Sequence, residues 1–168
     1  MTGMLGLDRI DADLRRSLLI RPAALAALFA ADRITKLWAM ESLAPRIAIP
    51  VLPCFQFTYV ENTGAAFGIG HSRNGFFIVL TLALLGMLFY MRRSWPRRDN
   101  WLESGFLLVA GGALGNLYDR LAYGFVVDFL DFRVWPVFNL ADSCVTVGAG
   151  CLAWGLYRLE KKTRALSC

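Results

Sequence analysis

Four apolar stretches, each close to the length that a helix needs to cross a bilayer, constrain this chain more than any other feature. About 20 apolar residues span the hydrocarbon core. Of the 168 residues, 57% are hydrophobic and 18% are charged, which is too apolar for an ordinary soluble domain. We therefore expect a single all-α membrane domain over residues 1–168, a four-transmembrane-helix bundle. The expected spans are about 22–40, 75–91, 101–118 and 139–157.

The positions of Lys and Arg predict how the bundle is oriented. Four basic residues lie in the N-terminal arm (1–21), four between the second and third spans, and four in the C-terminal tail, whereas the other two loops carry two each. Cytoplasmic segments of membrane proteins carry such an excess. We therefore predict that both termini are cytoplasmic and that segments 41–73 and 119–137 are extracytoplasmic. The net charge of +5 is then a topology signal, and nucleic acid is not an expected partner.

The two extracytoplasmic segments have strand-like patterns. In FQFTYV (55–60) aromatic side chains alternate with other residues, a period of two. GFVVDFLDF (124–132) is rich in β-branched and aromatic residues. We expect a small β platform at the outer membrane face, with ordered loops as the alternative.

The cysteines and the single histidine make a metal site or a disulfide framework unexpected. Cys54, Cys144, Cys151 and Cys168 form no CxxC pair and have no Cys/His metal spacing with His71. No cofactor is expected.

Two charged residues interrupt the first span. Asp32 and Lys36 are four residues apart, so they share one helix face. Because buried charges are usually paired, this spacing favours a structural ion pair inside the bundle.

Two further polar motifs allow structural explanations. ENTGAAFG (61–68) holds Asn62 and Gly64 and is typical of a turn. GGALGNLYDRLAYGFVVDF (111–129) begins with glycines that permit close helix packing. Asn116 follows, and then an adjacent aspartate and arginine, of which the arginine is Arg120. An amide and an ion pair at a helix exit are common.

The fourth span begins with FNLADS and carries a carboxylate. Asn139 is a good N-cap and Asp142 stands at the third helical position, so capping is one explanation of Asp142. Three residues correspond to about 4.5 Å of helix rise, which puts Asp142 just below the outer interface. Asp128 approaches the same interface from the preceding loop.

Two carboxylates in one wet pocket can hydrolyse an amide. Like charges a few ångströms apart do not both ionise easily, so one keeps a proton. The ionised carboxylate can deprotonate water, while the protonated one polarises the carbonyl and later protonates the leaving amine.

The chain resembles the lipoprotein signal peptidase (signal peptidase II) family of bacterial aspartyl membrane peptidases. The resemblance covers nearly the whole chain after the N-terminal arm. Four blocks carry it in the family's order: DRITK (32–36), ENTGAAFG (61–68), GGALGNLYDRLAYGFVVDF (111–129) and FNLADS (138–143).

The resemblance implies a role for each matching residue. Asp128 and Asp142 match the catalytic aspartates, and Asp32 and Lys36 match a polar pair in the first helix. We expect Arg120 to pair with a partly buried carboxylate and to orient the dyad. The residues matching those that support the dyad or grip substrate are Asn62, Gly64, Asn116, Arg120, Asn139 and Ala141.

The resemblance also implies the reaction and its location. The family removes signal peptides from diacylglyceryl-modified prolipoproteins, cutting before the lipidated cysteine. A monomer is expected in the bacterial inner membrane, with phospholipid around it and the active site at the periplasmic face. The cyclic peptide globomycin would block it. The long N-terminal arm and GIGHSRNGFF (68–77) depart from the family pattern.

Two alternatives belong to other classes. A small proton-coupled transporter would use Asp32, Lys36 and Asp142 as a relay, but relay residues should be spread through the bilayer depth. A noncatalytic scaffold would have no use for two convergent carboxylates.

Overall fold

The described part of the chain forms four long helices and one small sheet. The computed structural model describes residues 19–46, 48–64, 74–96 and 99–166. Most of the N-terminal arm, the end of ENTGAAFG (65–68) and residues 68–73 of the departing stretch therefore lie outside the described residues. The elements are α2 (Arg21–Ser42), β1 (Ile49–Leu52), β2 (Phe55–Asn62), α3 (Asn74–Arg92), α4 (Asn100–Ala122), β3 (Val126–Asp131) and α5 (Leu140–Leu166).

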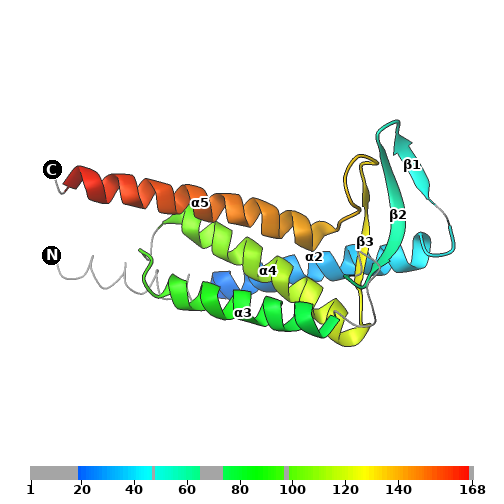
Figure 1. The fold of residues 1–168 in the computed structure, drawn as a ribbon, viewed down its shortest axis with the longest axis horizontal. Helices are drawn as coiled ribbons and strands as arrows, with labels where there is room; N and C mark the ends of the chain where they lie inside the picture. The colour runs from blue at the N-terminus through cyan, green and yellow to red at the C-terminus, as the bar shows by residue number, and fades with distance from the viewer. Residues whose placement is uncertain (1–18, 47, 65–73, 97–98, 167–168) are drawn as a thin grey trace.

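The helices lie side by side, and the sheet covers one end of them (Figure 1). Helices α2 and α4 run towards the sheet, whereas α3 and α5 run away from it. Helix α4 is central because the other three helices all contact it. The C-terminal end of α5 therefore lies at the end of the bundle opposite to the sheet.

Helix starts follow local capping chemistry. Pro22 stands in the first turn of α2, where its missing N–H costs no hydrogen bond. The Asp99 side chain caps α4 by accepting from the N–H groups of Trp101 at 2.9 Å and Leu102 at 3.1 Å. After α4, Gly124 adopts φ +84°, a conformation that L side chains rarely adopt, and the chain turns into β3.

Among the described helices, α3 and α5 are long and apolar enough to cross a membrane. Helices α2 and α4 have 22 and 23 residues, a spanning length, and both carry charged residues within that length. Much of their charge is turned inward, since Asp32, Lys36 and Asp119 are at most 2% exposed.

The helices are longer than the expected spans at two points. Helix α4 continues to Ala122, so Arg120 lies in its last turns rather than in an outer loop. Helix α5 continues to Leu166, so the basic tail is helical. The tail is rich in Leu, Glu, Lys and Arg, which are good helix formers.

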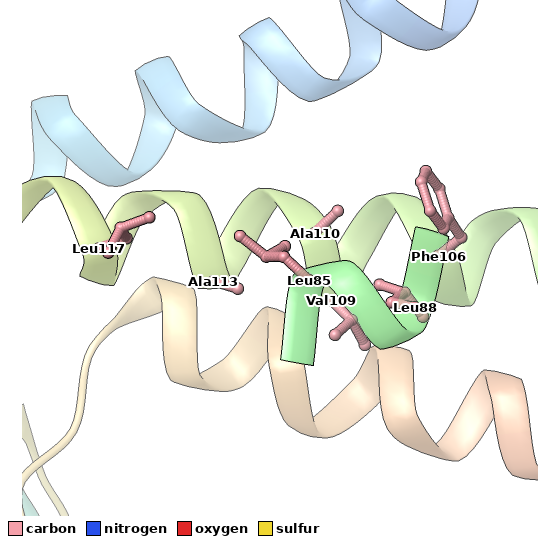
Figure 2. Close-up of a cluster of buried hydrophobic side chains, with 7 residues drawn as sticks. All are labelled: Leu85, Leu88, Phe106, Val109, Ala110, Ala113 and Leu117. Carbon is pink, nitrogen blue, oxygen red and sulfur yellow. The ribbon is translucent and has the colours of Figure 1, made fainter. Parts of the chain in front are cut away.

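One hydrophobic cluster joins α3 to α4. Leu85 and Leu88 are the buried residues of α3, and their side chains meet those of α4 in Figure 2. A second cluster joins the end of α2 to the sheet through Ala39, Leu43, Val127 and Phe129. The residues that α4 contributes to the first cluster are Phe106, Val109, Ala110, Ala113 and Leu117.

The β platform is confirmed as a three-stranded antiparallel sheet of order β1-β2-β3, and the ordered-loop alternative is wrong. Strands β2 and β3 pair with Val60 opposite Asp128 and Asn62 opposite Val126, after a register shift between Phe57 and Val60. Residues opposite one another share a sheet face. This register puts Asn62 on the face of Asp128 and within diagonal reach of it.

Glycines let α5 approach α4 closely. A Cβ at Gly148 would lie 2.8 Å from Leu108 Cβ and 2.9 Å from the backbone nitrogen of Val109, whereas a Cβ at Gly150 meets nothing within 4 Å. Small residues at such interfaces let helices associate in lipid.

We predict opposite effects for the two alanine substitutions. Gly148→Ala should reduce the free energy of unfolding by about 1–3 kcal/mol, because the helices must separate or distort. Gly150→Ala on the same helix should be neutral or stabilising by up to about 1 kcal/mol, since alanine is the better helix former. Thermal unfolding in detergent measures both, and equal midpoints would contradict the tight α4–α5 contact.

Candidate active site

The structure brings Asp128 and Asp142 into one site from different elements. Asp128 lies on β3 and is 1% exposed, whereas Asp142 lies in the first turn of α5 and is half-buried. The two are close enough for the charge of Asp142 to raise the pKa of Asp128. A strand and the helix that follows it in the chain therefore contribute one pair of carboxylates at the sheet end of the bundle.

Two asparagines hold the carboxylate of Asp128. The Asn62 Nδ2 donates to Oδ2 at 2.8 Å, and the Asn139 Nδ2 donates to Oδ1 at 2.7 Å. Burial nevertheless dominates and raises the pKa of Asp128 from its ordinary 3.8 to about 6, while the bond from Asn62 partly opposes this rise. The carboxyl group of Asp128 therefore retains a proton at mildly acidic pH.

Asp142 accepts hydrogen bonds at both oxygens. The Asn116 Nδ2 donates to Oδ1 at 2.7 Å, and the backbone N–H of Asn139 donates to Oδ2 at 3.2 Å. In return, the Asp142 N–H donates to Asn139 Oδ1 at 2.9 Å. This reciprocal pair is a capping box, so the capping arrangement is present alongside the contact with Asn116. Both carboxylate oxygens of Asp142 therefore face N–H donors.

The orientation of the Asn116 amide is fixed from its other side. Its Oδ1 accepts from Lys36 Nζ at 2.8 Å and from Asn139 Nδ2 at 3.2 Å. Because two donors face the amide oxygen, the amide NH₂ must point the other way, towards Asp142. Lys36 therefore acts on the half-buried carboxylate through Asn116.

A buried charge cluster lies directly behind these asparagines. Asp32 and Lys36 form the ion pair that their spacing predicts, with 2.9 Å between Oδ2 and Nζ. Asp119 Oδ2 also lies 2.9 Å from Lys36 Nζ and accepts from the N–H of Val127 at 3.2 Å. Asp32 Oδ1 accepts from the N–H of Ala141 at 3.2 Å. The cluster thus joins α2 and α4 to β3 and to the start of α5.

Sequence reasoning missed two members of this cluster. Arg33 forms an ion pair with Asp119, and its guanidinium lies 4.6 Å from the ring centroid of Tyr118. Asp119 is fully buried rather than at a wet helix exit. Its spacing of three residues from Asn116 on a helix could have indicated a shared face.

Gly64 and Arg120 occupy different positions relative to the site. Gly64, at φ +78°, donates its N–H to Asn62 Oδ1 at 2.9 Å and so orients that amide.

The expectation that Arg120 pairs with a carboxylate is wrong for the described residues: no ion pair of Arg120 is found there. Its guanidinium carbon instead lies 5.0 Å from the ring centroid of Phe77, because the end of α4 brings it to this aromatic face in the first turns of α3.

The arrangement has the chemical parts of an acid–base pair. Asp128 has a raised pKa, and Asp142 accepts hydrogen bonds at both oxygens and is partly exposed. Within the part of the chain that the structure describes, no three His, Cys, Asp or Glu side chains group together as a metal ion would require.

Comparison with known proteins assigns the chain to a family. The family model described as signal peptidase (SPase) II matches residues 24–158. The lipoprotein signal peptidase of Pelotomaculum thermopropionicum is 46% identical over 141 residues, which cover 83% of this chain and 92% of the relative. That of Halothermothrix orenii is 46% identical over 132 residues, covering 77% and 90%.

Solved structures agree with this assignment. Two bacterial membrane enzymes determined by the in meso method match with TM-scores of 0.73 and 0.74 at 28% and 29% identity. The matches cover 84% and 83% of this chain and 89% and 93% of those structures. The fold is therefore that of a membrane enzyme.

The chain belongs to the signal peptidase II family. It is accordingly a protease that processes lipoprotein precursors by removing their signal peptides, and the transporter alternative is not supported.

The raised pKa of Asp128 predicts a pH-dependent stability. An acid whose folded-state pKa is raised contributes stability that is present below its unfolded pKa and is lost as pH rises through the folded value. For Asp128 this window runs from about pH 4 to just above pH 6 and corresponds to about 3 kcal/mol. The melting temperature of Asp128→Asn minus that of the parent should therefore increase between pH 4 and pH 7.

Asp131→Asn is the control for this measurement. The pKa of Asp131 is lowered by the N–H of Arg133 and by Gln56, so this carboxylate stays ionised above pH 5. The difference between this variant and the parent should stay constant from pH 5 to pH 7. A constant difference for Asp128→Asn as well would contradict the raised pKa.

Proposed function

We propose that Asp128 and Asp142 are the catalytic dyad with which this peptidase cuts before the diacylglyceryl-modified cysteine of a prolipoprotein. The observation that carries the proposal is the position of Asn139. Its side chain donates to Asp128 at 2.7 Å and its backbone donates to Asp142 at 3.2 Å, so one residue holds both carboxylates together. A capping role for Asp142 alone would not require a second, buried carboxylate beside it.

The two environments suggest different roles in the reaction. Asp142, as the anion, removes a proton from water, and the resulting hydroxide attacks the carbonyl carbon of the scissile amide. Asp128, as the acid, donates its proton to the carbonyl oxygen. When the tetrahedral intermediate collapses, the C–N bond breaks and the leaving nitrogen takes the proton held by Asp142, while the carbonyl oxygen returns its proton to Asp128. Each carboxyl group then has its original protonation state.

The neighbouring asparagines and backbone groups would hold this geometry. Asn62 is oriented by Gly64, and Asn116 by Lys36, so each amide has one direction in which to donate. Arg120 is free of an ion pair among the described residues, which suits a group that grips substrate rather than one that holds the dyad. Ala141 contributes its N–H to Asp32. Globomycin would occupy the same pocket.

The depth of the site fits a lipid-anchored substrate. We propose four spans, cytoplasmic termini and a periplasmic site in the inner membrane. Asp142 stands two residues after the start of α5, about 3 Å along the helix, on the side of the bundle covered by the sheet. The acyl chains of a diacylglyceryl cysteine lie in the outer leaflet, which brings the preceding peptide bond to this depth. The signal helix would lie in the bilayer beside the bundle.

Substitution of either aspartate tests the dyad. Asp128→Asn and Asp142→Asn should each abolish cleavage of a lipidated prolipoprotein in detergent, because an amide cannot serve as acid or base. The double variant should be no less active than either single one, since the two groups act as a unit. A cooperative thermal unfolding transition in each variant would show that the chemistry, and not the fold, has been lost. Near-normal turnover in one variant would remove that aspartate from the mechanism.

Reporter fusions test the proposed topology. A fusion after Arg98, between α3 and α4, should report the cytoplasm, because the basic loop stays inside. A fusion after Arg133, beyond β3, should report the opposite side. If both fusions reported the same side, the four-span arrangement would be wrong. The dyad is tested separately, by the cleavage assay on the unfused protein.

A further inference from the structure

The C-terminal end of α5 carries a face that the peptidase reaction does not use. Helix α5 has 27 residues and is therefore about 40 Å long, whereas the hydrocarbon core is about 30 Å thick. About 20 residues from Leu140 fill the core, so the helix leaves it near Leu159. The last turns must lie among headgroups and in water, far from the two aspartates.

One side of these last turns is a continuous stripe. Its members recur at intervals of three and four residues, which puts them on a single helix face. The stripe consists of the described residues that line a shallow groove: Trp154, Tyr157, Arg158, Lys161, Lys162 and Ala165.

The stripe changes from aromatic to basic where the helix leaves the membrane. Trp154 and Tyr157 are 50% and 55% exposed, and their ring centroids are 5.7 Å apart. Such amphipathic rings favour the boundary between acyl chains and headgroups. Arg158, Lys161 and Lys162 follow within two turns and are exposed. The order along the helix therefore matches the order of layers in a lipid leaflet.

Nearby acidic charge does not cancel the stripe. Glu160 lies on the same turns but forms an ion pair with Arg164, with 2.5 Å between Oε1 and the guanidinium. Both members of that pair lie off the stripe, at the side of the helix. The stripe itself contains three cations and no carboxylate.

We propose that this face binds an anionic glycerophospholipid of the adjacent leaflet. The phosphate lies against Lys161 and Lys162, Arg158 flanks it, and the acyl chains run along Trp154 and Tyr157. Charge complementarity and the continuity of the stripe with the apolar part of α5 select a lipid over a soluble acidic partner. The site requires α5 to cross the membrane but does not require the dyad mechanism.

The test titrates the detergent-solubilised protein with dioctanoyl phosphatidylglycerol and follows binding by thermophoresis. Each cation near a phosphate contributes enough that losing two should weaken binding by about 30-fold. The Lys161→Gln/Lys162→Gln variant should therefore bind at least tenfold more weakly than the parent. The Arg46→Gln/Arg93→Gln variant loses the same net charge away from the stripe and should bind within about twofold of the parent.

Four further outcomes would overturn the proposal. If both variants bound equally weakly, net charge would explain the effect and there would be no defined site. If the parent bound dioctanoyl phosphatidylcholine as tightly as dioctanoyl phosphatidylglycerol, the site would not select an anionic lipid. Saturable binding of inorganic phosphate alone with the same loss on Lys161→Gln/Lys162→Gln would replace a lipid by a free anion. Saturable binding of an acidic peptide or an oligonucleotide in preference to the lipid would replace it by a soluble partner. Prolipoprotein cleavage in detergent should be unchanged in both variants, which separates this site from the peptidase function.

Discussion

The buried ammonium of Lys36 is the interaction on which the active site depends. Its side chain is 0% exposed, and an isolated cation at such a position would cost several kcal/mol. Three groups surround it: Asn116 Oδ1 accepts a hydrogen bond at 2.8 Å, and the carboxylates of Asp32 and Asp119 each form an ion pair at 2.9 Å. Removing any one of them would leave a buried charge or donor without its partner, so the set is retained or lost together.

The carboxylates of this cluster also accept backbone hydrogen bonds from the two elements that carry the catalytic aspartates. Asp119 uses an oxygen to hold the backbone of β3 at Val127, the neighbour of Asp128. Asp32 uses an oxygen to hold the start of α5 at Ala141, the neighbour of Asp142. The two carboxylates are thus positioned through adjacent residues by a single cation–anion cluster. Preorganisation of this kind avoids rearrangement during the reaction.

Local features of the site could be predicted from the sequence, and long-range ones could not. The capping box of Asn139 and Asp142, and the pair of Asp32 and Lys36, follow from spacings of three and four residues. The other partners of Lys36, Asn116 and Asp119, lie far away in the chain, so no spacing relates them to Lys36. Arg120 was expected to meet a carboxylate, but its helix continues and turns the guanidinium onto Phe77. The strands followed from their period of two, whereas the register that unites Asn62 with Asp128 depends on a local shift.

That shift between Phe57 and Val60 limits where the chain can change in length. Because strand side chains alternate between faces, inserting one residue between the shift and Asn62 would turn Asn62 away from Asp128. An insertion in the turn between β1 and β2 lies on the other side of the shift and leaves the pairing with β3 unchanged. Relatives should therefore vary in length at the β1–β2 turn and keep a constant count of residues from the shift to the active-site asparagine.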